Sequence, residues 1–88
     1  MTQREVYVIN HLGIHARPAF LIVQTSSAFD ADIWLEKDGT AANAKSVLSV
    51  MMLAAACDSK IVVSASGKDE ERAVEAVVKL FESKFNEE

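Results

Sequence analysis

Several ingredients are scarce in this chain of 88 residues, and each scarcity excludes a class of protein. The single cysteine, Cys57, can form no disulfide within the chain and cannot supply a zinc site made of several thiolates. The net charge is −4, which argues against binding nucleic acid through general phosphate neutralisation. The sequence has no apolar run long enough to cross a bilayer and no basic, apolar leader. We therefore expect a cytoplasmic protein that binds no nucleic acid and does not insert into membranes.

The remaining composition is that of a globular domain, with 50% hydrophobic and 25% charged residues. A chain of this length has no room for a second core, so we expect one domain over residues 1–88. Periodicity and turn residues predict strands at 5–9, 32–36, 40–43 and 60–65, and helices at 16–27, 46–56 and from about residue 70 onward. This order indicates an α+β fold, with a mainly antiparallel four-stranded sheet and three helices on one face.

Local signals support these boundaries. Pro18 is tolerated only in the first turn of a helix, and Asp38-Gly39 predicts a hairpin turn. Ser46 is expected to cap the second helix, and Ser66 with Asp69 resembles a capping box for the third. The third helix has the clearest apolar face, formed by Ala73, Val74, Val77, Val78, Phe81 and Phe85.

The chemistry is concentrated between Asn10 and Ala19. His15 comes just before the expected start of a helix, where backbone N–H groups and the helix dipole favour an anion. Arg17 adds a permanently charged planar donor, and Gly13 allows the loop to direct the imidazole. A neutral imidazole in such a place can accept a phosphoryl group, because this transfer needs mainly positioning and charge stabilisation.

Two other interpretations of the histidines stay open at this point. A histidine in a loop is often a solvated or structural residue without chemistry. His11 and His15 are four residues apart, which suggests a metal site, but Gly13 and Pro18 argue against a helix across both, and no third ligand is evident. We therefore expect no bound metal.

The motif Gly13-Ile14-His15-Ala16-Arg17-Pro18-Ala19 resembles the active-site motif of HPr, the histidine-containing phosphocarrier of the sugar phosphotransferase system. Residues 34–39 and 43–47 fall where HPr proteins carry similar segments, so the resemblance covers essentially the whole chain. It implies an open-faced β-sandwich. It also implies that Nδ1 of His15 takes phosphate from enzyme I and passes it to enzyme IIA domains. Arg17 and the backbone N–H groups of Ala16 and Arg17 would bind that phosphate.

Ser46 is a second candidate site. Besides its role as a helix cap, the resemblance implies regulatory phosphorylation there by an HPr kinase/phosphorylase, which is the role of the matching serine in many bacteria. A phosphate at this position would act on partners, because a dianion beside an apolar surface resists desolvation.

Every residue from Val47 to Cys57 except Ser49 is apolar, and a two-layer domain cannot bury all of them. Val50 and Leu53 are expected to face the sheet, with Ala54 or Cys57 beside them. The side chains that stay exposed would form an interface with partners. The alternatives are that two copies of the chain meet through them, or that the rest of the domain covers this helix more fully. The expected interface residues are Phe20, Gln24, Val47, Leu48, Met51 and Met52.

Some positions depart from the HPr pattern. Phe20 stands where alanine is usual, on the expected docking face, and Ala54 and Asp58 stand where many relatives have glycine. Asp58 tolerates a left-handed backbone and is expected to end the second helix. Basic residues that are frequent on the docking face are replaced by Gln24, Ser27 and Ser49.

Together, these features predict a monomeric phosphoryl carrier of the transferase class, which needs no cofactor and is not a turnover enzyme with its own pocket. One alternative is an HPr-like regulator in a nitrogen-type phosphorelay, or a transcriptional corepressor phosphorylated on Ser46. Another is an interaction module in which His15 is inert.

Overall fold

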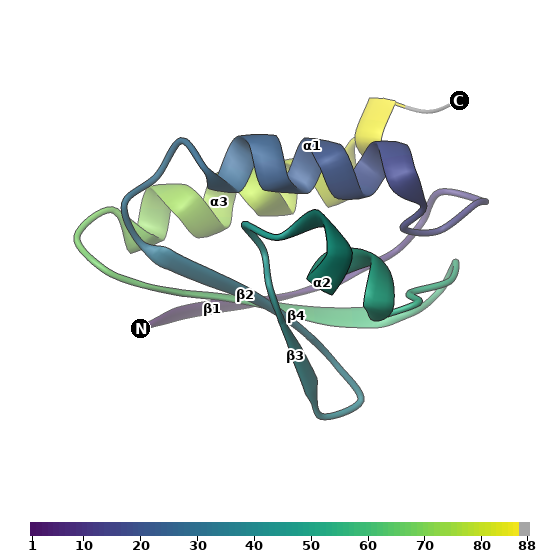
Figure 1. The fold of residues 1–88 in the computed structure, drawn as a ribbon, viewed down its shortest axis with the longest axis horizontal. Coiled ribbons are helices and arrows are strands. Elements are labelled where there is room, and N and C mark those ends of the chain that lie inside the picture. The colour runs from purple at the N-terminus through teal and green to yellow at the C-terminus, as the bar shows by residue number, and fades with distance from the viewer. Residues whose placement is uncertain (87–88) are drawn as a thin grey trace.

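The computed structural model describes residues 1–86 and confirms the expected order of strands and helices. The elements are β1 (Thr2–Tyr7), α1 (Ala16–Ser26), β2 (Asp32–Lys37), β3 (Thr40–Asn43), α2 (Val47–Met52), β4 (Lys60–Ser66), α3 (Glu70–Glu82) and a short 3₁₀ turn, η1 (Lys84–Asn86). The strand order in the sheet is β1-β4-β2-β3, and every neighbouring pair is antiparallel. The helices cover one face of this sheet (Figure 1), which is the predicted α+β open-faced sandwich.

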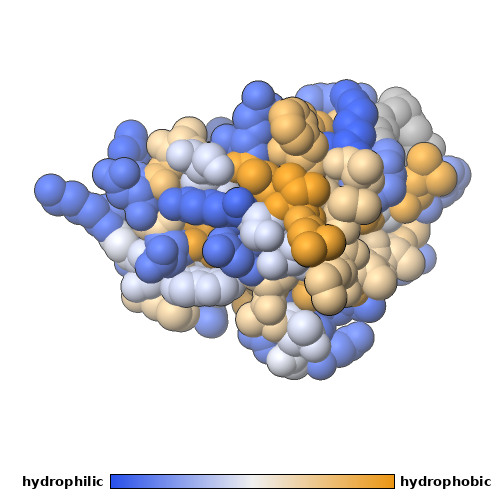
Figure 2. Space-filling model, in the orientation of Figure 1, coloured by the Kyte–Doolittle hydropathy of each residue, from blue (hydrophilic) through white to orange (hydrophobic). Residues whose placement is uncertain are grey.

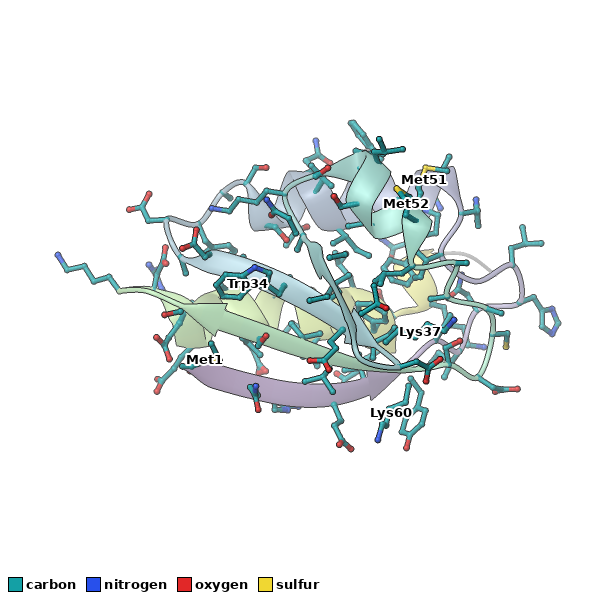
Figure 3. The ribbon with its side chains drawn as sticks, turned by 60° about the horizontal axis from the view of Figure 1, so that its bottom comes forward. Met1, Trp34, Lys37, Met51, Met52 and Lys60 are labelled. Carbon is teal, nitrogen blue, oxygen red and sulfur yellow. The ribbon has the colours of Figure 1, made fainter. Side chains whose placement is uncertain are left out.

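The core lies between the sheet and the helices. Alternation along the strands directs Ile33 and Leu35 of β2 toward the helices, while Trp34 between them is half-buried on the opposite, open face (Figure 3). Removing each such side chain from water stabilises the fold by about 1.5–3 kcal/mol relative to leaving it exposed. The helices contribute buried side chains on their sheet-facing sides: Ile22, Val50, Ala73, Val74, Val77, Val78 and Phe81. In the part of the chain that the structure describes, no helix combines the length and apolarity needed to cross a membrane.

Two turn predictions are confirmed. Pro18 is the third residue of α1, inside its first turn, where its missing N–H breaks no helical hydrogen bond. Asp38 and Gly39 have φ values of 51° and 84°, so the hairpin between β2 and β3 is a tight turn with two left-handed residues.

The first strand lies earlier in the chain than predicted. β1 ends at Tyr7, which pairs with Lys60, the first residue of β4. Val8 continues beyond the strand with hydrogen bonds to the loop before β4: its N–H donates to the Ser59 carbonyl (2.9 Å), and its carbonyl accepts from the N–H of Asp58 (2.7 Å). The polar residues 2–4 were not predicted as strand because an edge strand carries few apolar side chains, whereas the ladder with β4 places them in the sheet.

The second helix is shorter than predicted. α2 ends at Met52, and Ala54 then takes a left-handed conformation with φ of 51°. The helix therefore does not extend to residue 56, and Ala55 is buried. Of the two residues expected beside Val50 and Leu53, Ala54 is exposed and Cys57 is half-buried. Asp58 does have a positive φ of 74°, but it lies in the turn before β4 and does not end the helix.

The prediction of a capping box formed by Ser66 and Asp69 at the start of α3 is wrong. Asp69 is the N-cap residue, but its carboxylate accepts hydrogen bonds from the backbone N–H groups of Asp30 and Ala31, both at 2.9 Å, in the loop before β2. These bonds, that of Asp30 above all, lower the pKa of Asp69. The N–H of Gly67 donates to Glu70 Oε1 (3.0 Å), so the first turn of α3 is closed by Glu70 and not by Ser66.

Candidate functional site

His15 is the N-cap residue of α1. Its backbone is extended, with φ of −91° and ψ of −166°, and its carbonyl accepts the first helical hydrogen bond, from the N–H of Ala19 (3.0 Å). The side chain is half-buried and not part of the core. This position places the imidazole at the end of the helix where backbone N–H groups point outward and the dipole is positive.

The loop before His15 is braced by hydrogen bonds on both sides. Asn10 donates from Nδ2 to the Gly13 carbonyl (2.8 Å), and its own carbonyl accepts from the N–H of Gly13 (3.1 Å). Ile14 donates its N–H to the carbonyl of Ala55 (2.9 Å), in the segment that follows α2. These hydrogen bonds hold the backbone before His15 against the segment that follows α2, and they fix the conformation of the loop.

Arg17 stands in the first turn of α1, two residues after His15, and is exposed. It donates a hydrogen bond from Nη1 to the carbonyl oxygen of Phe85 (3.3 Å). The first turn of α1 contains no acidic residue, so nothing in that turn opposes the positive dipole or the guanidinium. A planar cation next to a helix N-terminus is a favourable environment for a phosphate group.

Ser46 is the N-cap of α2, as predicted. Its backbone is extended, its carbonyl accepts from the N–H of Val50 (3.0 Å), and its Oγ accepts from the N–H of Ser49 (3.3 Å). The preceding Lys45 reaches across to the loop that follows α1, where its Nζ donates to the Phe29 carbonyl (2.7 Å). The half-buried Ser46 therefore follows a residue that is tied to the loop after α1, and it begins α2 itself.

An apolar surface lies over α1 and α2, and we call it the α1–α2 patch. Its exposed members are Phe20 (58% exposed), Leu48 (70%), Met51 (41%) and Met52 (74%), and Val47 is half-buried among them. The two helices pack against each other. Figure 2 shows apolar residues gathered in the middle of this side of the molecule, and Figure 3 shows Met51 and Met52 projecting from α2. Gln24, also exposed, extends the surface along α1.

Two contributors to this region were not found from the sequence. The Ala55 carbonyl holds the loop at Ile14, although residue 55 was expected to be helical, and the Phe85 carbonyl holds Arg17, although residue 85 was expected to lie on the last helix. Both contacts join residues far apart in the chain, so no local pattern signals them. Among residues 1–86, no group of three or more His, Cys, Asp or Glu side chains is arranged to hold a metal ion.

Comparison with known proteins gives a consistent family assignment. The family described as the phosphotransferase system HPr component phosphorylation site matches residues 2–83. A curated phosphocarrier protein HPr of Treponema pallidum is 47% identical over 88 residues, covering all of both chains. HPr of Xylella fastidiosa is 43% identical over 88 residues, covering 100% of this chain and 99% of the relative.

The fold agrees with this assignment. The crystal structure of an HPr from Thermoanaerobacter tengcongensis superposes with a TM-score of 0.96 at 46% identity, over 100% of this chain and 99% of that one. A four-stranded antiparallel sheet covered on one face by three helices, in the order βαββαβα, is thus a fold that this chain shares with an HPr phosphocarrier. The chain belongs to the HPr family, the phosphocarrier proteins of the phosphotransferase system.

Proposed function

We propose that His15 is the residue that carries the phosphoryl group and that Arg17 stabilises it. The observation that carries this proposal is the position of His15 as N-cap of α1, accessible to solvent, with Arg17 in a first turn that has no acidic residue. The N–H groups of Ala16 and Arg17 belong to this turn, and Pro18 follows without an N–H. This arrangement supports a transient dianion held by backbone donors and a guanidinium.

The transfer itself needs no further chemistry from this chain. Neutral His15, with its proton on Nε2, attacks phosphorus through the lone pair of Nδ1. The N–P bond to the ring forms as the bond between phosphorus and the donor breaks, and the donor keeps that electron pair. In the second transfer the acceptor attacks phosphorus, and the His15 ring leaves with the electron pair of the N–P bond. Arg17 stabilises the charge on the phosphoryl oxygens in both directions.

Membership of the HPr family implies enzyme I as the donor and enzyme IIA domains as acceptors. We propose that both dock on the α1–α2 patch, because this exposed apolar surface borders the helix that begins at His15. Two exposed methionines suit a surface that meets several partners, since their flexible thioethers adapt to different shapes. We further propose that the chain works in the cytoplasm as a monomer, with this patch kept for its partners.

We propose Ser46 as a regulatory phosphorylation site for an HPr kinase/phosphorylase. Ser46 is half-buried and directly precedes Val47, at the border of the α1–α2 patch. A phosphate on Ser46 would replace the present cap by a dianion at the start of α2 and would place that charge beside the docking surface. The expected consequence is weaker association with partners and not loss of the fold.

The main experiment compares His15→Ala with His11→Ala, which removes the other histidine of the same loop. We expect radioactive phosphoenolpyruvate with enzyme I to label the wild type and His11→Ala but not His15→Ala. Full labelling of His15→Ala would overturn the proposal. Mass spectrometry of the protein from cells, under conditions that preserve acid-labile N–P bonds, then reports phosphate on His15 and on Ser46 separately.

Docking can be followed through the methyl groups of the three methionines. Titration with enzyme I is expected to shift or broaden the Met51 and Met52 signals and to leave that of Met1 unchanged, because Met1 lies at the far end of β1 from the patch (Figure 3). Equal changes at all three methyl groups would contradict docking on the α1–α2 patch.

A further inference from the structure

We propose that the open face of the sheet is a second interaction surface, which binds an arginine-rich segment of a partner protein while the α1–α2 patch stays free. The contact is made by three residues of β2, Asp32, Trp34 and Glu36, which we call the β2 stripe. The inference goes beyond the proposed function and does not depend on it, because the stripe lies on the side of the sheet away from the helices.

The β2 stripe consists of an aromatic ring between two carboxylates. Alternation along β2 places its three members on the uncovered face, since the residues between them, Ile33 and Leu35, are buried under the helices. At a rise of about 3.3 Å per residue, each carboxylate lies about 7 Å from the tryptophan along the strand, and the two lie about 13 Å apart. Figure 3 shows the tryptophan on the front of the sheet.

The Trp34 ring is only half-buried, because its neighbours are too short to cover it. Ser64 of β4 and Asn43 of β3 pair directly with Trp34, so the side chains on either side of it are small and polar. Lys60 also lies on this face, but it stands four positions before Ser64 in β4, and its Nζ is 3.8 Å from a carboxylate oxygen of Glu5. One face of the indole is therefore left open to a ligand.

The two carboxylates of the β2 stripe are exposed and available. Among residues 1–86, neither of them forms an ion pair or a side-chain hydrogen bond. The strands direct three carboxylates to the open face, those of Glu5, Asp32 and Glu36, against the one ammonium group of Lys60. This negative charge repels nucleic acid, anionic lipid and a second copy that presents the same face, and it attracts a cation.

A guanidinium fits the stripe better than other cations do. It stacks on an indole face within about 6 Å of the ring centre, and its planar N–H groups donate to a carboxylate at the same time. One guanidinium cannot reach two carboxylates about 13 Å apart, whereas a segment with several arginines can bind the ring and both of them. A cavity of about 350 Å³ beside Glu36, lined also by Val62 and Asp38, gives such a segment room to continue.

The experiment uses the fluorescence of Trp34, the one tryptophan of the chain, as a direct reporter of the stripe. The full chain is titrated with an acetylated, amidated hexa-arginine peptide and with a Gly-Ser peptide of the same length. We expect a saturable change in emission with the arginine peptide alone, weakened by 0.5 M salt because salt screens the exposed carboxylates. An unchanged emission, or an equal change with the Gly-Ser peptide, would overturn the proposal.

Matched variants separate the stripe from the net charge of the protein. Asp32→Asn combined with Glu36→Gln keeps the shape of the stripe and should weaken binding about 3- to 10-fold. Glu71→Gln combined with Glu82→Gln removes the same charge from exposed positions of α3 and should weaken it less than about 2-fold. Equal losses in the two double variants would mean diffuse attraction and no site.

The contribution of the ring and the location of the site are tested by NMR. Trp34→Leu should bind the arginine peptide about 2- to 5-fold more weakly, as measured by the backbone amide signals of Ser64 and Asn43. In the wild type, the methyl signals of Met51 and Met52 should not shift as the peptide saturates the stripe, because both residues belong to α2 on the other side of the sheet. Full affinity of Trp34→Leu, or shifts at these methyl groups, would contradict binding at the β2 stripe.

Discussion

Gly13 is the residue on which the local geometry of the candidate site depends most directly. Its φ is +69°, and a Cβ added there would lie 2.5 Å from the Ala55 carbonyl oxygen and 3.0 Å from Cα of Ala56. The same carbonyl accepts the N–H of Ile14, so the loop cannot move away without losing that hydrogen bond. The absence of a side chain thus allows two backbones to meet directly, immediately before His15.

We predict that Gly13→Ala lowers the free energy of unfolding by about 2–4 kcal/mol, because the left-handed backbone and the overlap with Ala55 both add to the cost. Gly39→Ala is the matched control: its φ is +84°, but a Cβ there meets no atom within 4 Å, so only the backbone cost of about 1–2 kcal/mol remains. Urea unfolding measures both. Equal losses in the two variants would show that the Ala55 contact does not matter.

The positions of His15 and Arg17 at the start of α1 could be predicted from the sequence, and the reason is local. Whether a histidine caps a helix, and whether an arginine follows it in the first turn, depends on residues within one helical turn and on Pro18. Phe85 was expected on a helical face instead. Burial was predicted correctly for it, since that follows from its apolar side chain, but the reversal of the chain that buries it was not.

At the scale of the elements, the end of α2 shows how the tertiary structure shortens a helix. Lys37 from the hairpin strand β2 approaches this end, with its Nζ 3.4 Å from the Leu53 carbonyl and 3.5 Å from that of Ala54. A cation that binds the last carbonyls of a helix stabilises its C-terminus. The chain then leaves the helix through Ala54, at a φ of 51° that glycine adopts far more readily.

Ala54→Gly is therefore predicted to stabilise the protein by about 0.5–1 kcal/mol, since relief of the left-handed strain exceeds the added entropy of the unfolded chain. Ala56→Gly, two residues further on and also exposed, has no positive φ to relieve and is expected to destabilise by about 0.4–1 kcal/mol. Thermal unfolding measures whether each variant has a higher or a lower melting temperature than the wild type. A lower melting temperature for Ala54→Gly would contradict the strain at this position.

At the scale of the whole molecule, two neighbouring carboxylates at the start of α3 connect segments that are distant in the chain. Asp69 holds the loop before β2 through Asp30 and Ala31. Glu70 holds the start of β1, because its Oε2 accepts from Oγ1 of Thr2 (2.7 Å). The hydrogen bond from Thr2 and then that from Gly67 favour the ionised carboxylate and lower the pKa of Glu70 from 4.5 to about 2.

The lowered pKa gives a prediction for acid stability. Glu70 contributes stability at pH values above 4.5, and this contribution is lost as the pH falls from 4.5 toward 2, because the folded state then has to bind a proton that the unfolded state binds more readily. Glu70→Gln should therefore be less stable than the wild type at pH 7, and the difference should disappear near pH 2. Thermal unfolding across this range measures it, with exposed Glu71→Gln as control. A difference that is constant with pH would contradict the assignment.

Much of the fold could be predicted because its signals are short. Short runs of strand-forming residues identified β2 and β4, and a 3.6-residue period identified α3. Asp38-Gly39 identified the hairpin and with it the return strand β3. The predictions failed where a partner distant in sequence decided the outcome. β1 was misplaced because its ladder with β4 sets its limits. The capping box at α3 was wrong because the carboxylate of Asp69, the N-cap residue, binds the loop at Asp30 and not the backbone of its own helix.

The amino-acid sequence alone determined the kinds of element, the histidine at a helix start, the arginine beside it and the apolar surplus on α2, since each depends on chemistry within a turn or two of the chain. Only the tertiary structure decided where α2 ends, which carbonyl braces Ile14 and which carbonyl holds Arg17. These contacts join residues 16 to 68 positions apart, and they form because burying residues such as Phe85 brings those backbones together.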